Sequence, residues 1–152
     1  MSDDLPIIEF AFPGPLRDRL LDTITKGIKT ATSSLVHEDN IDGSPLPTVG
    51  PQGVAVDSQG DAFLVLETTA VAVVRLGEVT LQHALDEGEG YASVAEWRAG
   101  HERFWTSAEM LEELGADFAL TDDTMVILER FRAIQRPSPS STAGLWEHPE
   151  AA

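Results

Sequence analysis

Lys29 lies in a short segment, Gly27-Ile28-Lys29-Thr30-Ala31-Thr32, whose residue types could act together in catalysis. An unperturbed lysine has a pKa of about 10.4 and is a poor base, but burial in an apolar pocket lowers that pKa and can produce a base or a nucleophile. The hydroxyls of Thr30 and Thr32 could position a carbonyl group or stabilise an oxyanion. The alternative interpretation is an exposed lysine beside threonines on the surface of a strand.

Glu67 is the second candidate, because it interrupts the apolar run 63–76. An unpaired carboxylate inside a strand is costly to bury, so we expect Glu67 to have either a partner or a raised pKa. One interpretation places it on a solvated strand face. The functional hypothesis pairs Glu67 with Lys29, so that the two exchange a proton and act as an acid/base unit for amide hydrolysis.

Tyr91 is the aromatic residue that we expect to reach a ligand, since it follows a glycine-rich turn. Trp97, Phe104 and Trp105 recur at helical spacing, which favours core packing over base stacking. The acidic run 86–90 could bind a hard cation, but no set of oxygen ligands is fixed in space, so a solvated turn is expected. The four histidines show no metal-ligand spacing, and we expect neither a metal nor a cofactor.

The charge is unevenly distributed along the chain. Its 152 residues include 26 acidic and 10 basic ones, a formal net charge of −16, which opposes tight binding of long nucleic acids. Residues 17–29 hold four basic and two acidic side chains. We expect Arg17, Arg19 and Lys26 to form the solvated face of a helix. The pattern favours a small, weakly charged ligand in one pocket.

The rest of the composition is that of an ordinary globular protein. Hydrophobic residues make up 42% of the chain and cysteine is absent, which excludes disulfides and thiolate chemistry. No apolar run approaches the ~18 residues that a membrane span requires, and no signal peptide is visible. We therefore expect a cytoplasmic protein without a membrane partner.

The elements that must position these residues follow from periodicity and turn signals. An amphipathic helix is predicted between Pro15 and Gly27, and a strand over 29–36 precedes a long surface loop over 37–51. The remaining elements are a hairpin of strands 53–58 and 63–76, helices over 78–88, 93–105 and 107–115, and a closing strand over 124–134. This order predicts an α+β domain, with a leader over 1–12 and a disordered tail over 136–152.

Four blocks of sequence, taken in order, resemble the ASCH domain family of the PUA-like superfamily. They are PLRDRLLDTITKGIKTATSSL, VAVDSQGDAFLVLETTAVAVVRLGEV, DEGEGYASVAEWRAGHERFW and VILERF. The resemblance extends from about Pro13 to Phe131. It implies a small β-barrel with flanking helices, and we place the domain at residues 13–135.

The family's hallmark, Gly-x-Lys-x-x-Glu-x-Arg, is matched only in part. Gly27 and Lys29 match, but Thr32 replaces the glutamate and Ser34 the arginine, which weakens any carry-over of RNA binding. A second branch, the small N4-acetylcytidine amidohydrolases, has Lys-Thr-x-Thr at this site and a glutamate in a later strand. Lys29, Thr32 and Glu67 fall on those positions.

The resemblance thus implies an amidohydrolase of an acylated pyrimidine nucleoside or a related small amide. Lys29 would be the base or nucleophile, Thr32 the oxyanion donor and Glu67 the proton carrier. The residues expected to bind substrate are Thr30, Ser34 and Tyr91. The alternatives are an RNA or modified-nucleobase binding module and a ribonuclease. Lys29 and Thr32 are three residues apart, so they can share a pocket only if the backbone turns or bulges at Lys29.

Overall fold

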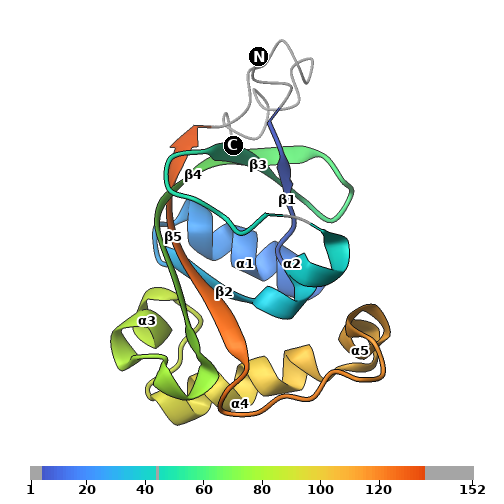
Figure 1. Ribbon diagram of the computed structural model, residues 1–152. Helices are drawn as coiled ribbons and strands as arrows, with labels where there is room; N and C mark the ends of the chain where they lie inside the picture. The colour runs from blue at the N-terminus through green and yellow to red at the C-terminus, as the bar shows by residue number, and fades with distance from the viewer. Residues whose placement is uncertain (1–4, 44, 136–152) are drawn as a thin grey trace.

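The computed structural model describes residues 5–43 and 45–135, which form a mixed α+β fold around one five-stranded sheet (Figure 1). The strand order is β1 (Ile7–Ile8), β3 (Gln52–Val56), β4 (Ala62–Arg75), β5 (Met125–Gln135) and β2 (Ala31–Leu35). Only the β1–β3 pair is parallel. The edge strands β1 and β2 do not pair with each other, so the sheet is not closed into the expected β-barrel.

The predicted hairpin and closing strand are confirmed as β3, β4 and β5. The hairpin turn is fastened by the Asp57 carboxylate, which accepts hydrogen bonds from the amides of Gln59 and Asp61 at 2.9 Å each. Strand β4 pairs with β3 near its start and with β5 along most of its fourteen residues. Its pairing with β5 shifts register between Val65 and Leu66 and again after Thr68, irregularities that bend and twist paired strands.

The helices begin largely at the signals that the sequence carries. Helix α1 (Pro15–Thr25) has proline in its first turn, and α4 (Val94–Trp105) and α5 (Ala108–Leu114) follow serine caps at Ser93 and Ser107. The helix predicted over 78–88 is shorter: Leu76–Glu78 form a 3₁₀ turn and α3 covers Leu81–Asp86. In Figure 1, α1 lies within the curve of the sheet, and α3, α4 and α5 gather below it, at the bottom of the view.

The loop predicted over 37–51 is wrong at its start, where α2 (Val36–Asp42) forms. This helix is two turns long, too short for a visible apolar period. Its support is specific: the Glu38 carboxylate accepts from the Leu35 amide at 3.0 Å, and the His37 ring donates to the Leu114 carbonyl at 2.8 Å. A distant carbonyl therefore fixes an element that local pattern does not reveal.

Two apolar clusters hold the helices to the sheet. One joins α1 to the sheet, and its buried members are Phe10, Leu20, Leu21, Ile24, Ala55, Leu64, Leu66 and Phe131. The other lies under α3, α4 and α5, and its buried members are Leu35, Leu76, Val79, Ala84, Trp97, Trp105, Met110, Leu114 and Val126. The expected core positions of Trp97 and Trp105 are confirmed. The space between the two clusters is where the site lies.

Part of the predicted leader belongs to the fold, because β1 pairs with β3 and Phe10 is buried. Arg17 holds this segment in place: it is 2% exposed and donates to the carbonyls of Phe10 at 3.0 Å and Ala11 at 2.7 Å, and it pairs with Glu9. The expectation of a solvated Arg17 is therefore wrong. The predicted tail over 136–152 lies outside the described residues. Among those described, no helix is long and apolar enough to cross a membrane.

Candidate functional site

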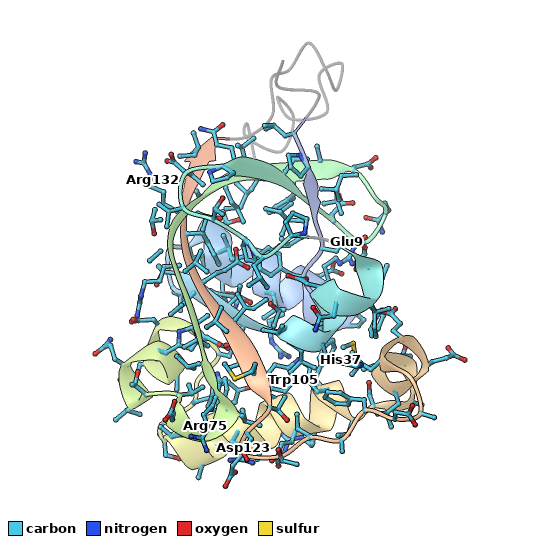
Figure 2. All side chains as sticks on the ribbon, viewed as in Figure 1. Glu9, His37, Arg75, Trp105, Asp123 and Arg132 are labelled. Atoms are coloured by element: carbon cyan, nitrogen blue, oxygen red, sulfur yellow. The ribbon has the colours of Figure 1, made fainter. Side chains whose placement is uncertain are left out.

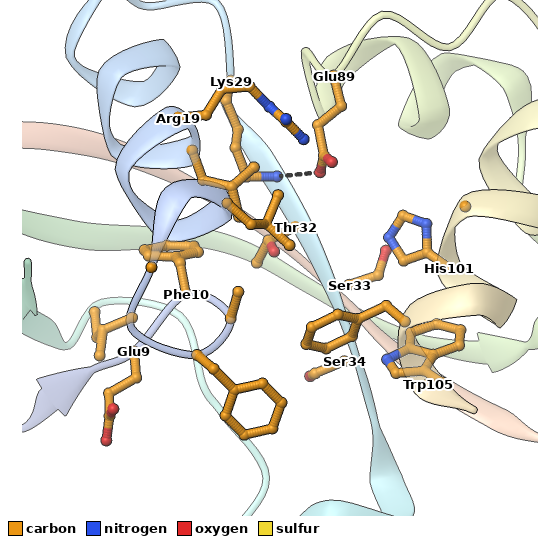
Figure 3. Close-up of a pocket in the computed structure, with 18 of the residues that line it drawn as sticks. Glu9, Phe10, Arg19, Lys29, Thr32, Ser33, Ser34, Glu89, His101 and Trp105 are labelled. Atoms are coloured by element: carbon orange, nitrogen blue, oxygen red, sulfur yellow. Dashed lines mark hydrogen bonds and ion pairs between the residues drawn. The ribbon is translucent and has the colours of Figure 1, made fainter. Parts of the chain in front are cut away.

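A cavity of about 740 Å³ opens between the two clusters (Figure 3). Its walls come from the segment before α1 and the first turns of that helix, from Lys29 and β2, from Glu89 and Tyr91, and from the second half of α4. This volume suits a small organic ligand. Of the residues predicted from sequence, the cavity brings together Lys29, Thr32, Ser34 and Tyr91, but neither Thr30 nor Glu67 lines it.

Lys29 reaches the cavity because it precedes the regular strand. Helix α1 ends at Thr25 and is followed two residues later by Gly27, whose φ of +77° only glycine adopts readily. The amides of Ile28 and Lys29 both donate to the Thr23 carbonyl. Strand β2 begins only at Ala31. Strand alternation therefore does not apply between Lys29 and Thr32, and the turn that a shared pocket requires is present.

The Lys29 side chain is 1% exposed and is surrounded by acceptors. Its Nζ lies 2.8 Å from the Ala31 carbonyl, 3.4 Å from the Glu87 carbonyl and 3.2 Å from Oε2 of Glu89. An ammonium group has three donors, and three oxygens receive them here. The geometry therefore holds Lys29 as a cation beside the Glu89 carboxylate, as Figure 3 shows.

The acidic run 86–90 is packed against Lys29, which corrects the expectation of a solvated turn. Gly88 has φ +69°, and a Cβ there would lie 2.4 Å from the Ile28 carbonyl oxygen, so only glycine permits this approach. Thr30 fastens the same contact, since its amide donates to the Asp86 carbonyl at 2.9 Å and its hydroxyl at 3.3 Å. Thr30 thus positions the turn. The prediction that it binds substrate is not supported, because Thr30 does not line the cavity.

Glu87 is the most buried carboxylate of the site, with no exposed surface. Its Oε2 accepts from the Ser33 hydroxyl and lies 2.9 Å from His83 Nε2, while Oε1 lies 3.0 Å from His101 Nε2. Burial by itself raises the pKa of Glu87, but the adjacent His101 and His83 rings and the charge of Lys29 outweigh burial. Its pKa consequently lies well below the ordinary value.

Glu87, Glu89 and His101 could hold a metal ion, because one ligand atom from each lies within 4.8 Å of the others. His101 Nδ1 donates to the Trp97 carbonyl at 2.9 Å, which orients the ring as in many metal sites. Histidine spacing alone did not reveal this group, which combines one histidine with two glutamates from a different element. Among the described residues, the cation that pairs with Glu89 is the Lys29 ammonium.

Glu67 lies outside the cavity. Strand register places it opposite Arg132 on β5, and the Arg132 guanidinium pairs with Oε1 of Glu67 at 2.6 Å. Figure 2 shows Arg132 on the outside of the molecule, far from Trp105 at the cavity wall. The predicted pairing of Glu67 with Lys29 is therefore not formed, and the carboxylate beside Lys29 belongs to Glu89.

Tyr91 packs across α4 at Gly100, where a Cβ would lie 2.4 Å from the tyrosine oxygen. Burial and the charges of Glu89 and Glu87 raise the pKa of Tyr91 to about 12. The hydroxyl consequently stays neutral at pH 7 and can donate a hydrogen bond. Two further cavity carboxyls, Glu38 and Glu129, have raised pKa values, in both cases chiefly because they are buried.

Comparison with known proteins gives a family and a fold. A family model described as "ASCH domain" matches residues 8–135. The crystal structure of an ASCH domain from Lactobacillus crispatus is 27% identical, with a TM-score of 0.70 over 86% of this chain and 81% of that one. A protein structure from Enterococcus faecalis is 21% identical, with a TM-score of 0.77 over 92% and 82%. No curated protein matches the sequence.

Proposed function

Because the chain belongs to the ASCH domain family, we propose that it is an amidohydrolase acting on an acylated pyrimidine nucleoside of the N4-acetylcytidine type. One observation carries the proposal: a buried lysine–glutamate pair, Lys29 with Glu89, lies beside Thr32 in the wall of a nucleoside-sized cavity. The resemblance supplied the roles of Lys29 and Thr32. The contacts of Lys29 support giving the proton-carrier role to Glu89 in place of Glu67.

In the reaction that we propose, a water molecule attacks the acyl carbon and its proton passes to the Glu89 carboxylate. The hydroxyl of Thr32 donates to the oxyanion of the tetrahedral intermediate. Lys29, held as a cation, gives a proton to the leaving nitrogen as the C–N bond breaks. Glu89 then returns its proton to Lys29 across the 3.2 Å that separates them. The products are a carboxylic acid and the free amine, so atoms and protons balance.

The roles of Lys29 differ in one respect from those expected at first. Its three donors already have acceptors, which disfavours a nucleophilic amine in the resting state. Lys29 acts as the general acid in this scheme once the Glu89 carboxylate has taken the proton of water, because the donor held by Glu89 is then free to turn to the leaving nitrogen. The aromatic part of the cavity supports binding of a flat ring. The ring centroids of Phe12 and Phe104 lie 5.9 Å apart, and both rings line the cavity together with Tyr91. These rings give surfaces on which a pyrimidine can stack.

A second candidate is a reader of a modified nucleobase that uses the same cavity without turnover. The observation that favours it is the complete set of acceptors around Lys29, which also suits a purely structural cation. The net charge of −16 disfavours long RNA for both the binding and the ribonuclease alternatives.

The proposal is tested by incubating the full chain with N4-acetylcytidine and following its absorbance together with acetate release. We expect turnover in the wild type and in Lys26→Met, because Lys26 is the other lysine and pairs with Asp22 on the surface. Lys29→Met should lower kcat by about 10²–10⁴-fold. Equal turnover by both variants would overturn the assignment. Saturable binding without hydrolysis of any N4-acyl pyrimidine would favour the reader.

A further inference from the structure

Two arginines differ from every other basic residue in the described part of the chain. No carboxylate among the described residues lies within ion-pair distance of Arg19 or Arg103, although the chain holds 26 acidic residues. The other described lysines and arginines are all paired: Arg17 with Glu9, Lys26 with Asp22, Lys29 with Glu89, Arg75 with Asp123, Arg98 with Glu102, Arg130 with Asp86 and Arg132 with Glu67. In so acidic a protein, an arginine without a carboxylate needs an explanation.

Both unpaired arginines line the same cavity. Arg19 comes from α1 and Arg103 from α4, two helices far apart in sequence. Burial and nearby carboxylates raise the pKa of Tyr91, and the charges of Arg19 and Arg103 act in the opposite direction. Both guanidinium groups therefore lie within electrostatic range of one hydroxyl. Figure 3 shows Arg19 among the side chains around the cavity.

The cavity thus has two chemically different parts. Lys29 is buried and its charge is already neutralised by Glu89, whereas Arg19 and Arg103 are exposed and their charges are not. A ligand that fits both parts has an uncharged polar group at its inner end and an anionic group at its outer end. Arginine is well suited to phosphate, which it binds by paired hydrogen bonds.

We propose that the cavity binds a 5′-phosphorylated pyrimidine nucleoside, with its terminal phosphate on Arg19 and Arg103. This inference rests on the proposed function for the position of the base, and it narrows the substrate class from a nucleoside to a nucleoside monophosphate. A longer polyanion is disfavoured because Glu9 and Glu109 also line the cavity and would face additional phosphates.

The binding test uses the full chain and two probes that cannot be hydrolysed at an amide, cytidine and cytidine 5′-monophosphate, in isothermal titration calorimetry. We expect the wild type to bind the monophosphate about tenfold or more tightly than the nucleoside, the scale of charge-assisted hydrogen bonds. Arg19→Gln and Arg103→Gln should each reduce that preference, and the double variant should abolish it while cytidine affinity stays unchanged. Arg75→Gln, which removes a paired arginine outside the cavity, is the matched control.

Equal affinity of the wild type for the two probes would overturn the inference, as would tighter binding of a short oligoribonucleotide than of the monophosphate. Measuring hydrolysis of the nucleoside and of its 5′-monophosphate separates failure of this inference from failure of the proposed function. A phosphate preference without hydrolysis of N4-acetylcytidine 5′-monophosphate keeps the inference and rejects the hydrolase. Hydrolysis of the nucleoside and the nucleotide with equal kcat/KM keeps the hydrolase and rejects the inference.

Discussion

Two acid–base pairs of the same chemical kind occupy opposite environments in this protein. Lys29 and Glu89 are separated by 3.2 Å, with side chains 1% and 15% exposed, and they lie at a cavity. Arg132 and Glu67 are separated by 2.6 Å, with side chains 68% and 24% exposed, and they lie on the outer surface. The comparison teaches that contact distance alone does not separate the two pairs, whereas burial and access to a cavity do.

The two pairs also have different origins. Sheet register alone places Glu67 opposite Arg132. Glu89 reaches Lys29 only because the turn at Gly88 approaches the Ile28 backbone more closely than a side chain would allow. The pair at the cavity therefore depends on tertiary packing of a turn, and the surface pair depends on regular strand pairing.

The largest expected difference between the pairs is in stability. Lys29→Met leaves Glu89 without its cation in a mostly buried position and should lower the free energy of unfolding by about 3–5 kcal/mol. Arg132→Met breaks a solvent-exposed pair and should cost about 0–1 kcal/mol. Urea unfolding of both variants at pH 7 measures the difference. Equal losses would show that burial does not distinguish the pairs.

A smaller loss of stability is expected from substitution of Gly88, the glycine that packs against the Ile28 backbone. Gly88→Ala should displace the turn from Ile28, lower stability by about 1–3 kcal/mol and reduce turnover nearly as much as loss of Glu89 itself. Gly60→Ala is the matched control, because Gly60 also has a positive φ but no atom lies within 4 Å of its Cβ position. The Gly60→Ala variant should lose only about 1 kcal/mol of folding stability, from the backbone strain that alanine introduces at a positive φ, and should keep full activity. A Gly88 variant with normal turnover would show that the close approach is dispensable.

The smallest effect concerns pH. The folded-state pKa of Glu87 lies below its unfolded value of 4.5, so its contribution to stability is complete above pH 4.5 and declines as the pH falls toward the folded-state pKa. The stability advantage of the wild type over Glu87→Gln should therefore be about 1.4 kcal/mol smaller at pH 3.5 than at pH 7. Denaturant unfolding across this range checks the slope. An advantage that grows on acidification would contradict a carboxylate held in its charged form.

The sequence was a good guide where the determinants are local. The serine caps at Ser93 and Ser107 predicted their helices, and the segment of Lys29 and Thr32 predicted one wall of the cavity. It was a poor guide where the partner is distant. Helix α2 depends on a carbonyl at Leu114, and Glu89 is 60 residues from Lys29.

The misassignment of Glu67 has the same cause. A lone carboxylate in an apolar strand indicates a partner, but sequence alone does not say which of several cations stands opposite. The register of β4 against β5 places Arg132 opposite Glu67. The closed barrel implied by the resemblance is not formed, because the two-residue strand β1 and the strand β2 remain separate edges of the sheet. Long-range pairing decided both outcomes.

The most direct test of the central claim is to compare kcat of Glu89→Gln and Glu67→Gln on N4-acetylcytidine, with folding of both variants verified by circular dichroism. Glu89→Gln should lower kcat by about 10²–10⁴-fold, the range for loss of a general acid/base group, and Glu67→Gln should leave it unchanged. A folded Glu89→Gln variant with wild-type kcat, or a loss confined to Glu67→Gln, would contradict the account.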